Sequence, residues 1–462
     1  MKKLSILLLF TLLVTVGAGC TGGTSTASFD DIDIVIWRVF DDDDTFDAII
    51  DNYRALHPNI SVEYKKLRYD EYEDELIQAF AEGRGPDVLS LHNTWLPDYQ
   101  VLLEPMPSST TVSYLETQGT LRKETVVVSR TTNTMSMREL ESSFVEQVAE
   151  DVVLDYQIDP DIDPVEKIYG LPMAMDTMTL FYNKDLLNAA GIATPPSTWS
   201  EFQDDIIALT TYDSDGNVDQ SGAAIGTSDN VERAADILSL LMMQNGTEMT
   251  DERGRVYFHE IPKDSPEGVY PGYDATSFYT DFANPTKEVY TWNDNFDSSY
   301  ESFANGETAM FFGYSYHIPL LQAAAPKLNY AIAQAPQISG GREVNFANYW
   351  VECVAAASEN PEWAWNFILF ATDEDQVINY LDEAQKPTAL RNLIGGQLDH
   401  SLLGAFAEQI LTAQSWYHGY DAAVTEDVFG DLIDTILAGT DDPENAMNSA
   451  ASRISDTYNK SD

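Results

Sequence analysis

Apolar positions near the start of the fold follow first a strand pattern and then a helix pattern. Residues 32–37, IDIVIW, form a β-rich apolar run. Phe46, Ile49, Ile50 and Tyr53 follow at the i, i+3, i+4, i+7 spacing that places side chains on one buried helix face. The sequence therefore predicts a strand followed by a helix.

The same order of elements continues through residues 60–91. Residues 60–64 alternate as a second strand, a helical pattern covers 72–80, and a Gly/Pro break precedes an apolar run at 87–91. A β-α-β-α-β order predicts a parallel sheet. Ligands of such sheets bind beside the carboxyl ends of the strands.

Two predicted loops lie at such strand ends. The first follows Trp37 and contains the acidic run 41–44, and the second contains His92, Asn93 and Trp95. Because each loop brings an aromatic side chain together with polar groups, we expect both loops to contact a ligand.

Residues 168–199 are the most informative stretch of the chain. Residues 171–182 are rich in apolar side chains and Thr, which predicts a buried strand, and Asp176 is its single charge. Residues 183–190 then form a predicted short helix that Gly191 ends. A buried carboxylate needs hydrogen-bond donors. We expect these to come either from a ligand or from backbone that Asp176 holds in place.

The rest of the chain alternates less regularly. Residues 107–163 begin with a Ser/Thr-rich run and continue with a helical pattern over 137–154, and 246–289 are predicted to be a long polar connection. The acids of 213–219 lack the spacing of a calcium loop, so a turn is expected there. The other predicted elements are helices at 199–209 and 231–244, strands at 308–313, 328–335 and 349–357, and helices from 361 to 455 with an interruption near Trp416.

The N-terminus has the layout of a secretory signal. Lys2 and Lys3 precede an apolar run at 4–16, small residues fill 17–19, and Cys20 follows. This arrangement resembles the bacterial lipoprotein lipobox, in which the cysteine receives diacylglycerol, although Gly17 stands where Leu or Val is usual. We therefore expect a signal peptide at 1–19, lipidation of Cys20, a flexible linker at 20–28 and attachment to the outer face of the cell membrane. Ordinary secretion is the alternative.

Length, charge and missing motifs narrow the function. A chain of 462 residues is long enough for two lobes, and 76 acidic against 25 basic residues give a net charge of −51, which argues against nucleic acid as a partner. Such acidity also suggests a saline environment.

No HExxH, CxxC or P-loop motif occurs, and residues 313–317 miss the nucleophile elbow. We predict no cofactor, no metal and no catalysis. A glycosidase is the enzymatic alternative, because so many acidic residues form carboxylate pairs by chance and a glycosidase needs such a pair. The remaining cysteine, Cys353, lies in an apolar run and is predicted to be buried.

Aromatic side chains with polar neighbours are abundant at predicted loops. Flat rings stack on the C–H faces of sugars, and Asp and Asn bind hydroxyl groups, so the combination favours a saccharide cleft. A core position is the alternative for each ring and is expected for Trp363 and Trp365. The candidate aromatics are Trp37, Trp95, Tyr316, Tyr349, Trp350, Trp416 and Tyr417.

Several segments together resemble the extracellular solute-binding proteins of family 1, the maltose-binding-like receptors of ABC transporters. The segments that carry the resemblance are IVIW at 34–37, HPNISV at 57–62, GPDV at 85–88, YNKD at 182–185, PPSTW at 195–199 and FANGETAM at 303–310.

The resemblance implies an α/β, periplasmic-binding-protein-like fold with two discontinuous lobes, a hinge and a central ligand cleft. The N-terminal lobe would comprise 29–165 and 334–375, and the C-terminal lobe 166–333 and 376–462. Crossings between the lobes would lie just before Tyr169 and near 331–336.

The resemblance also assigns site residues and partners. Asp176 stands at a ligand-binding carboxylate, Tyr316 near a stacking tryptophan and Trp416 at a late stacking aromatic, while His92, Asn93 and Trp95 follow a contact segment. The implied protein is a monomeric, extracytoplasmic lipoprotein that captures a carbohydrate, most simply an oligosaccharide, and delivers it to permease subunits. A polyamine, peptide or glycerol phosphate as ligand is the first alternative, and a cell-surface glycan adhesin that does not transport is the second.

Overall fold

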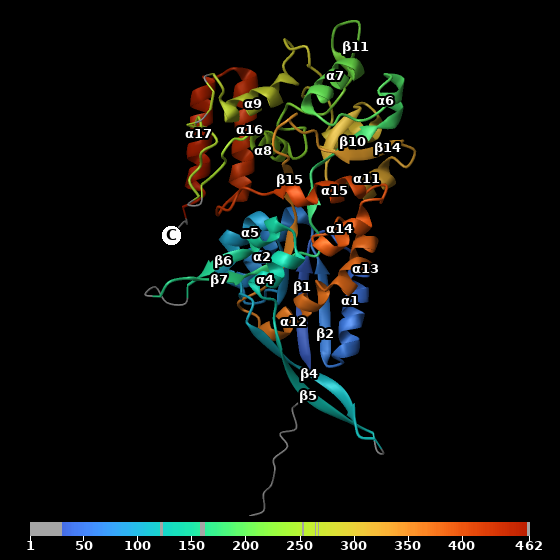
Figure 1. Ribbon diagram of the computed structural model, residues 1–462, viewed down its shortest axis with the longest axis vertical. Helices are drawn as coiled ribbons and strands as arrows, with labels where there is room; N and C mark the ends of the chain where they lie inside the picture. Colours follow the sequence, from blue (N-terminus) through green and yellow to red (C-terminus); the bar gives the residue numbers. More distant parts are fainter. Residues whose placement is uncertain are drawn as a thin grey trace, which may run out of the picture.

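A computed structural model shows two α/β lobes stacked along the long axis of the molecule (Figure 1). The predicted signal peptide (1–19), Cys20 and linker (20–28) lie outside the described residues. The structure describes residues 30–120, 123–157, 162–251, 254–263, 265–266 and 268–459.

The first lobe is built on a five-stranded sheet with the order β2-β1-β3-β16-β8. β1 runs parallel to both β2 and β3, as the β-α-β-α-β pattern predicts. The elements that begin the lobe are β1 (Ile32–Arg38), α1 (Asp43–Leu56), β2 (Ile60–Lys66), α2 (Tyr69–Ala81), β3 (Val88–His92) and α3 (Leu96–Tyr99), and β8 (Gly170–Leu171) and β16 (Trp350–Val354) complete the sheet.

A long hairpin projects from the end of this lobe (Figure 1). β4 (Ser109–Gln118) pairs with β5 (Glu124–Asn133) over its whole length. Val112 is buried at the base, whereas Leu115 is exposed further out. The Ser/Thr-rich run at the start of 107–163 is therefore a strand. The helical pattern over 137–154 divides into α4 (Met137–Ser143) and α5 (Glu146–Val152), followed by the paired strands β6 (Val153–Tyr156) and β7 (Val165–Ile168).

The second lobe contains a three-stranded sheet with the order β13-β10-β14, surrounded by helices. The long polar connection predicted at 246–289 contains a helix, α9, and 213–219 forms the expected turn between β11 and β12. The elements are β10 (Thr179–Asn183), α6 (Lys184–Ala189), α7 (Trp199–Leu209), β11 (Thr211–Tyr212), β12 (Val218–Gln220), α8 (Ala234–Gln244), α9 (Pro271–Asp281), α10 (Ser299–Asn305), β13 (Met310–Gly313), α11 (His317–Ala324), β14 (Tyr330–Gln334), α15 (Gly404–Gln409), α16 (Ala422–Ala438) and α17 (Pro443–Asp456).

A small separate sheet with the order β17-β15-β9 lies where the chain passes between the lobes. Met175 packs in the core of the first lobe and Met178 in that of the second, so the first crossing is at β9 (Asp176–Thr177). The expected crossing just before Tyr169 is wrong, because Tyr169 itself packs in the first core. The segment 171–182 is therefore not one buried strand, because it leaves one sheet, crosses and enters another. β15 (Asn345–Asn348) makes the return crossing, and β17 (Ala413–Gln414) pairs with it. The return crossing expected near 331–336 is wrong, because that segment still pairs with β10 in the second lobe.

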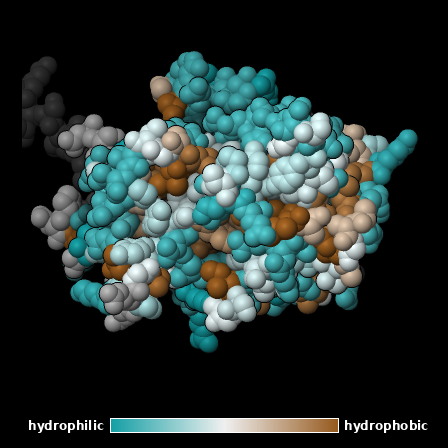
Figure 2. Space-filling view, turned by 90° about the horizontal axis from the view of Figure 1, so that it is seen from above, coloured by the Kyte–Doolittle hydropathy of each residue, from teal (hydrophilic) through white to brown (hydrophobic). Residues whose placement is uncertain are grey.

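The late helices divide between the lobes. α12 (Pro361–Ala371), α13 (Glu374–Ala384) and α14 (Arg391–Gln397) supply buried side chains to the core of the first lobe. Residues 376–394 thus pack there, rather than in the second lobe as expected. Cys353 is a free, buried thiol. The face of the molecule seen from above in Figure 2 is mostly hydrophilic, and its apolar side chains lie in small separate patches.

Candidate ligand-binding cleft

A cavity of about 300 Å³ lies between the two lobes. Parallel strands β1 and β3 end at this edge of the first sheet, and antiparallel β16 begins there, so their terminal residues converge on one place. The side chains that line the cavity include Arg38, Phe40, Asp41, Tyr69, Ser90, His92, Trp95, Asp176, Arg233, Ser315, Tyr316, Asn348, Tyr349, Trp350, Tyr380, Lys386 and Glu426.

Aromatic rings form one wall of the cavity. Trp350 makes T-shaped contacts with Phe40, Tyr69 and Trp95, whose ring centroids lie 5.5, 6.2 and 5.3 Å from its own. Tyr316 of the second lobe lies nearly parallel to Phe40, at 6.4 Å and 6°. Phe40, Tyr69 and Tyr316 keep 45%, 53% and 36% of their surface exposed. These rings are therefore held in place and can still stack on a ligand.

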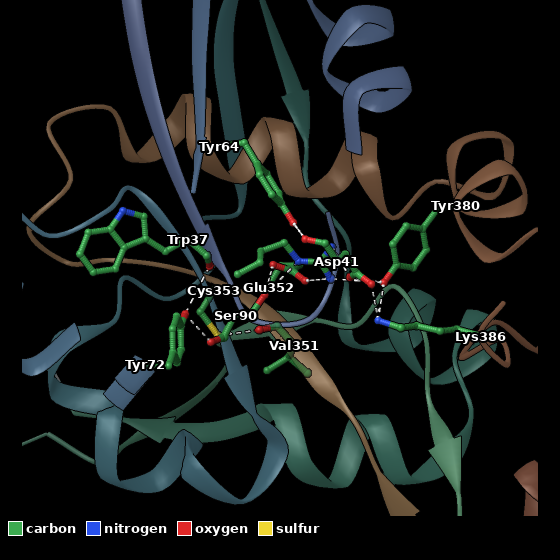
Figure 3. A network of polar contacts seen from close by, with 11 residues as sticks. Trp37, Asp41, Tyr64, Tyr72, Ser90, Val351, Glu352, Cys353, Tyr380 and Lys386 are labelled. Atoms are coloured by element: carbon green, nitrogen blue, oxygen red, sulfur yellow. Dashed lines mark hydrogen bonds and ion pairs between the residues drawn. The ribbon is translucent and has the colours of Figure 1, made fainter. Parts of the chain in front are cut away.

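A buried ionic network around Asp41 forms the floor of the cavity (Figure 3). Arg38 pairs with Asp41 at 2.8 Å and with Glu352 at 2.9 Å, and Lys386 pairs with Asp41 at 2.6 Å. The hydroxyl of Tyr380 donates to Asp41 at 2.8 Å. Burial by itself would raise the pKa of Asp41, but Lys386 and Arg38 outweigh it and hold the pKa well below the usual range. Asp41 is therefore ionised and balanced by its partners.

The second lobe contributes a further paired cation. Arg233 binds Asp236 through two hydrogen bonds of 2.8 Å and Glu426 through bonds of 2.9 and 2.8 Å. Its backbone is left-handed, with φ +60°, which non-glycine residues adopt at some energetic cost. The two carboxylates fix the guanidinium at the cavity surface.

Asp176 joins the first crossing strand to the loop after β13. Its Oδ2 accepts from the backbone N–H of Ser315 at 2.8 Å and from the Ser315 hydroxyl at 2.5 Å, and its Oδ1 accepts from the backbone N–H of Thr177 at 2.9 Å. Burial raises the pKa of Asp176 to about 7, against the opposing effect of these hydrogen bonds. The carboxylate thus holds backbone in place and also lines the cavity.

His92 is a neutral hydrogen-bonding group in the cavity. Burial lowers its pKa to about 4, and the nearby positive charge of Arg233 acts in the same direction. Its ring nitrogens lie 2.7 Å from the Thr94 hydroxyl and 3.2 Å from the side-chain oxygen of Asn348. The ring orientation is therefore set before any ligand binds.

The structure brings most of the predicted site residues together. His92, Trp95, Asp176, Tyr316, Tyr349 and Trp350 line the cavity. Tyr349 is almost fully buried and donates its hydroxyl to Asp151 at 2.6 Å, so its part in the wall is mainly structural.

Three predicted site residues lie elsewhere. Trp37 is buried on the sheet beneath Lys65, whose Nζ is 4.1 Å from the ring centroid. Asn93 is buried and donates to Asp151 and to the Ser415 hydroxyl, each at 3.0 Å. Trp416 packs in the second core and donates its indole N–H to Ser239 at 3.0 Å. These residues have polar neighbours in the sequence, but tertiary packing buries their side chains outside the cavity.

Sequence reasoning missed several cavity residues. Phe40 and Tyr69 follow the ends of β1 and β2, so the strand-end rule could have found both. Arg233 and Glu426 come from the starts of helices almost two hundred residues apart, and no local pattern relates them.

Among the described residues, no cluster of His, Cys, Asp or Glu has the arrangement to hold a metal ion. The helices of that part of the chain also include none with both the length and the apolar composition needed to cross a bilayer.

Two lobes, crossing strands and a cavity between them are the architecture of proteins that bind a small ligand between their lobes. The chain belongs to the family of bacterial extracellular solute-binding proteins, which matches residues 48–389.

The chain is also similar to other binding proteins in sequence, and to solved structures in fold. A galactooligosaccharide-binding protein of Bacillus subtilis (strain 168) is 22% identical over 97% of this chain and 96% of its own length. A protein of Brucella abortus (strain 2308) named as a binding protein is 25% identical over 162 residues, which are 35% of this chain and only 31% of that protein. The crystal structure of a cyclic α-maltosyl-1,6-maltose binding protein from Arthrobacter globiformis aligns with a TM-score of 0.69 and 17% identity, covering 92% of this chain and 99% of that one.

Proposed function

We propose that this protein captures a neutral carbohydrate, an oligosaccharide in its simplest form, and delivers it to the permease subunits of an ABC transporter. The observation that carries the proposal is an exposed aromatic wall above a floor whose charges are already paired. Sugars need stacking surfaces and directional hydrogen bonds, and they carry no charge that would need a free counter-ion. The names of the Bacillus and Arthrobacter relatives point to the same ligand class.

Charge pairing argues against the alternative solutes. Arg38 and Lys386 share Asp41, and Arg233 is held by Asp236 and Glu426. A glycerol phosphate would find its cations already neutralised, and a polyamine would have to displace a cation from each carboxylate. A neutral polyol can bind without breaking any of these pairs.

Closure of the lobes is the proposed mechanism. Phe40 of the first lobe and Tyr316 of the second lie nearly parallel beside the cavity, with ring centroids 6.4 Å apart, so a ligand next to them would contact both only when the lobes approach. The ligand then stabilises the closed state by contacts that the open state lacks. No covalent step is part of this proposal, and a sugar would leave the cleft unchanged.

The proposed location is outside the cytoplasmic membrane, with a lipid on Cys20 and a monomeric binding unit. Residue 30, the first that the structure describes, lies ten residues beyond Cys20, a span of at most about 36 Å. Loss of membrane association after Cys20→Ser, measured by cell fractionation, would support the anchor, and unchanged association would contradict it.

Titration calorimetry with a panel of solutes tests the ligand class. We expect binding of maltooligosaccharides or galactooligosaccharides, and no binding of spermidine or glycerol 3-phosphate. Small-angle scattering of the sugar complex should show compaction. A protein that binds sugar without compaction would be a non-transporting adhesin, and release of reducing ends from the sugar would indicate a glycosidase.

A further inference from the structure

Gln409, the last residue of α15, makes three hydrogen bonds through its side chain beside the first crossing strand. It is fully buried. Its Nε2 donates to the Thr177 hydroxyl at 2.8 Å and to the Met178 carbonyl at 2.7 Å. Its Oε1 accepts from the backbone N–H of Ala335 at 3.0 Å. Both amide hydrogens and the amide oxygen are thus satisfied, by the first crossing strand, by the residue that follows it and by the residue after β14.

We infer that Gln409 is a positioning residue for the ligand cleft, because it fixes the first crossing strand against α15 and against the end of β14. In the small sheet, Thr177 lies opposite Ala347, and Asp176 lies opposite Asn348. Asp176 and Asn348 both line the cavity. By holding Thr177, Gln409 determines how this pair faces the ligand. The inference rests on the proposed site, but the position of Gln409 does not depend on which sugar binds.

The partners of Gln409 also indicate where the lobes bend. Met178 and Ala335 pack in the core of the second lobe, so Gln409 attaches the crossings to that lobe. Met175 and Ala347 pack in the core of the first lobe. Rotation between the lobes is therefore absorbed on the first-lobe side of Gln409, next to Asp176 and Asn348.

Gln244 provides a matched control. It is almost fully buried, its Oε1 accepts from the Trp199 indole N–H at 2.6 Å, and its Nε2 donates to the carbonyls of Pro336 and Val344 at 3.1 and 3.0 Å. It makes the same number of hydrogen bonds as Gln409. None of them reaches the first crossing strand.

The test compares Gln409→Met with Gln244→Met in a Cys20→Ser background. Spin labels on cysteines introduced at exposed Asp51 of the first lobe and Leu320 of the second report the distance between the lobes. The native Cys353 is buried and escapes labelling. Pulsed electron resonance is recorded without ligand, so a wrong sugar assignment does not affect the result. We expect both variants to melt at lower temperature, and only Gln409→Met to broaden or shift the distance distribution.

Thr177→Val gives a milder version of the test, since it removes one acceptor of Gln409 and keeps the shape of the side chain. It should broaden the distribution less than Gln409→Met, and it serves alone if Gln409→Met does not fold. A distribution unchanged from the parent protein in the folded Gln409 or Thr177 variant would overturn the inference. Equal broadening in Gln244→Met would overturn it too, because the effect would then follow general destabilisation.

Discussion

Tyr316 and Trp416 have similar sequence surroundings but different fates. Each follows a serine in a short aromatic segment. Tyr316 precedes α11 at the cavity and keeps 36% of its surface exposed, whereas Trp416 is covered by the second core, with its ring centroid 5.7 Å from that of Phe429. What separates them is the packing of distant helices, which a local pattern does not contain.

Removal of the Tyr316 ring should weaken sugar binding. Tyr316→Ala removes the second-lobe ring that lies parallel to Phe40, and we expect calorimetry to show a loss of about 1–3 kcal/mol in binding free energy. Tyr273 on α9 is a matched control, because it has the same exposed fraction, 36%, and lies outside the cavity. Equal affinity of Tyr316→Ala and Tyr273→Ala would contradict the assignment.

Asp176 should make stability fall as pH rises. Its pKa is about 7 in the folded protein and about 4 in an unfolded chain, so the folded state retains a proton that the unfolded state releases. The stabilisation is complete below about pH 4 and is lost as the pH passes about 7.

Asp176→Asn cannot titrate and isolates this contribution. Between pH 4 and pH 8, the unfolding free energy of the parent should fall relative to Asp176→Asn by on the order of 2–4 kcal/mol, measured by denaturant unfolding. A constant difference between the two proteins would contradict the raised pKa. If sugar affinity at pH 8 falls in the variant while stability does not, the carboxylate also contacts the ligand.

At the scale of elements, regular periodicity predicted structure well. The β-α-β-α-β beginning, its parallel pairing and the capped helix α7 are confirmed, since each has clear apolar spacing or a capping box. β4 was missed because its Ser/Thr-rich strand has few apolar positions, and α9 was missed among Gly and Pro residues. The run at 171–182 was joined into one strand because uniform apolarity does not reveal where a chain changes lobes.

The outer half of the β4-β5 hairpin should be dispensable for folding. Thr110 and Val112 anchor its base, and the Tyr114 ring lies 4.5 Å from that of His57, but the strands beyond pair only with each other. A two-stranded ribbon adds little stability by itself. Replacing residues 115–127 with Asn-Gly, which suits a tight turn between Tyr114 and Val128, should leave the melting temperature nearly unchanged.

The base of the hairpin gives the contrasting control. Val112→Ala removes buried methyl groups next to α12 and should lower the melting temperature clearly. If the shortened hairpin melts as early as Val112→Ala or earlier, the outer half stabilises the lobe after all.

At the scale of the whole molecule, the cleft is assembled from segments that are remote in sequence. Its aromatic wall contains residues near 40, 69, 95, 316 and 350, and its ionic floor connects Arg38 to Lys386 through Asp41. Strand ends predicted part of this surface, because the ends of β1 and β3 meet at one edge of the sheet. The rest depends on how the lobes face each other, and only the crossing strands determine that.

Net charge is also a property of the whole molecule, and it predicts a dependence on salt. With 76 acidic and 25 basic residues, the folded chain brings like charges closer together than the unfolded chain does. Raising NaCl from about 0.01 M to about 1 M shortens the Debye length from about 30 Å to about 3 Å and screens this repulsion. The melting temperature should therefore rise, with most of the gain below about 0.3 M because screening saturates there. A melting temperature that stays constant would show that the acidic groups are spaced widely enough not to oppose folding. A rise that remains linear up to 1 M, matched by an uncharged excluded solute such as sucrose, would assign the effect to solvent exclusion instead of charge.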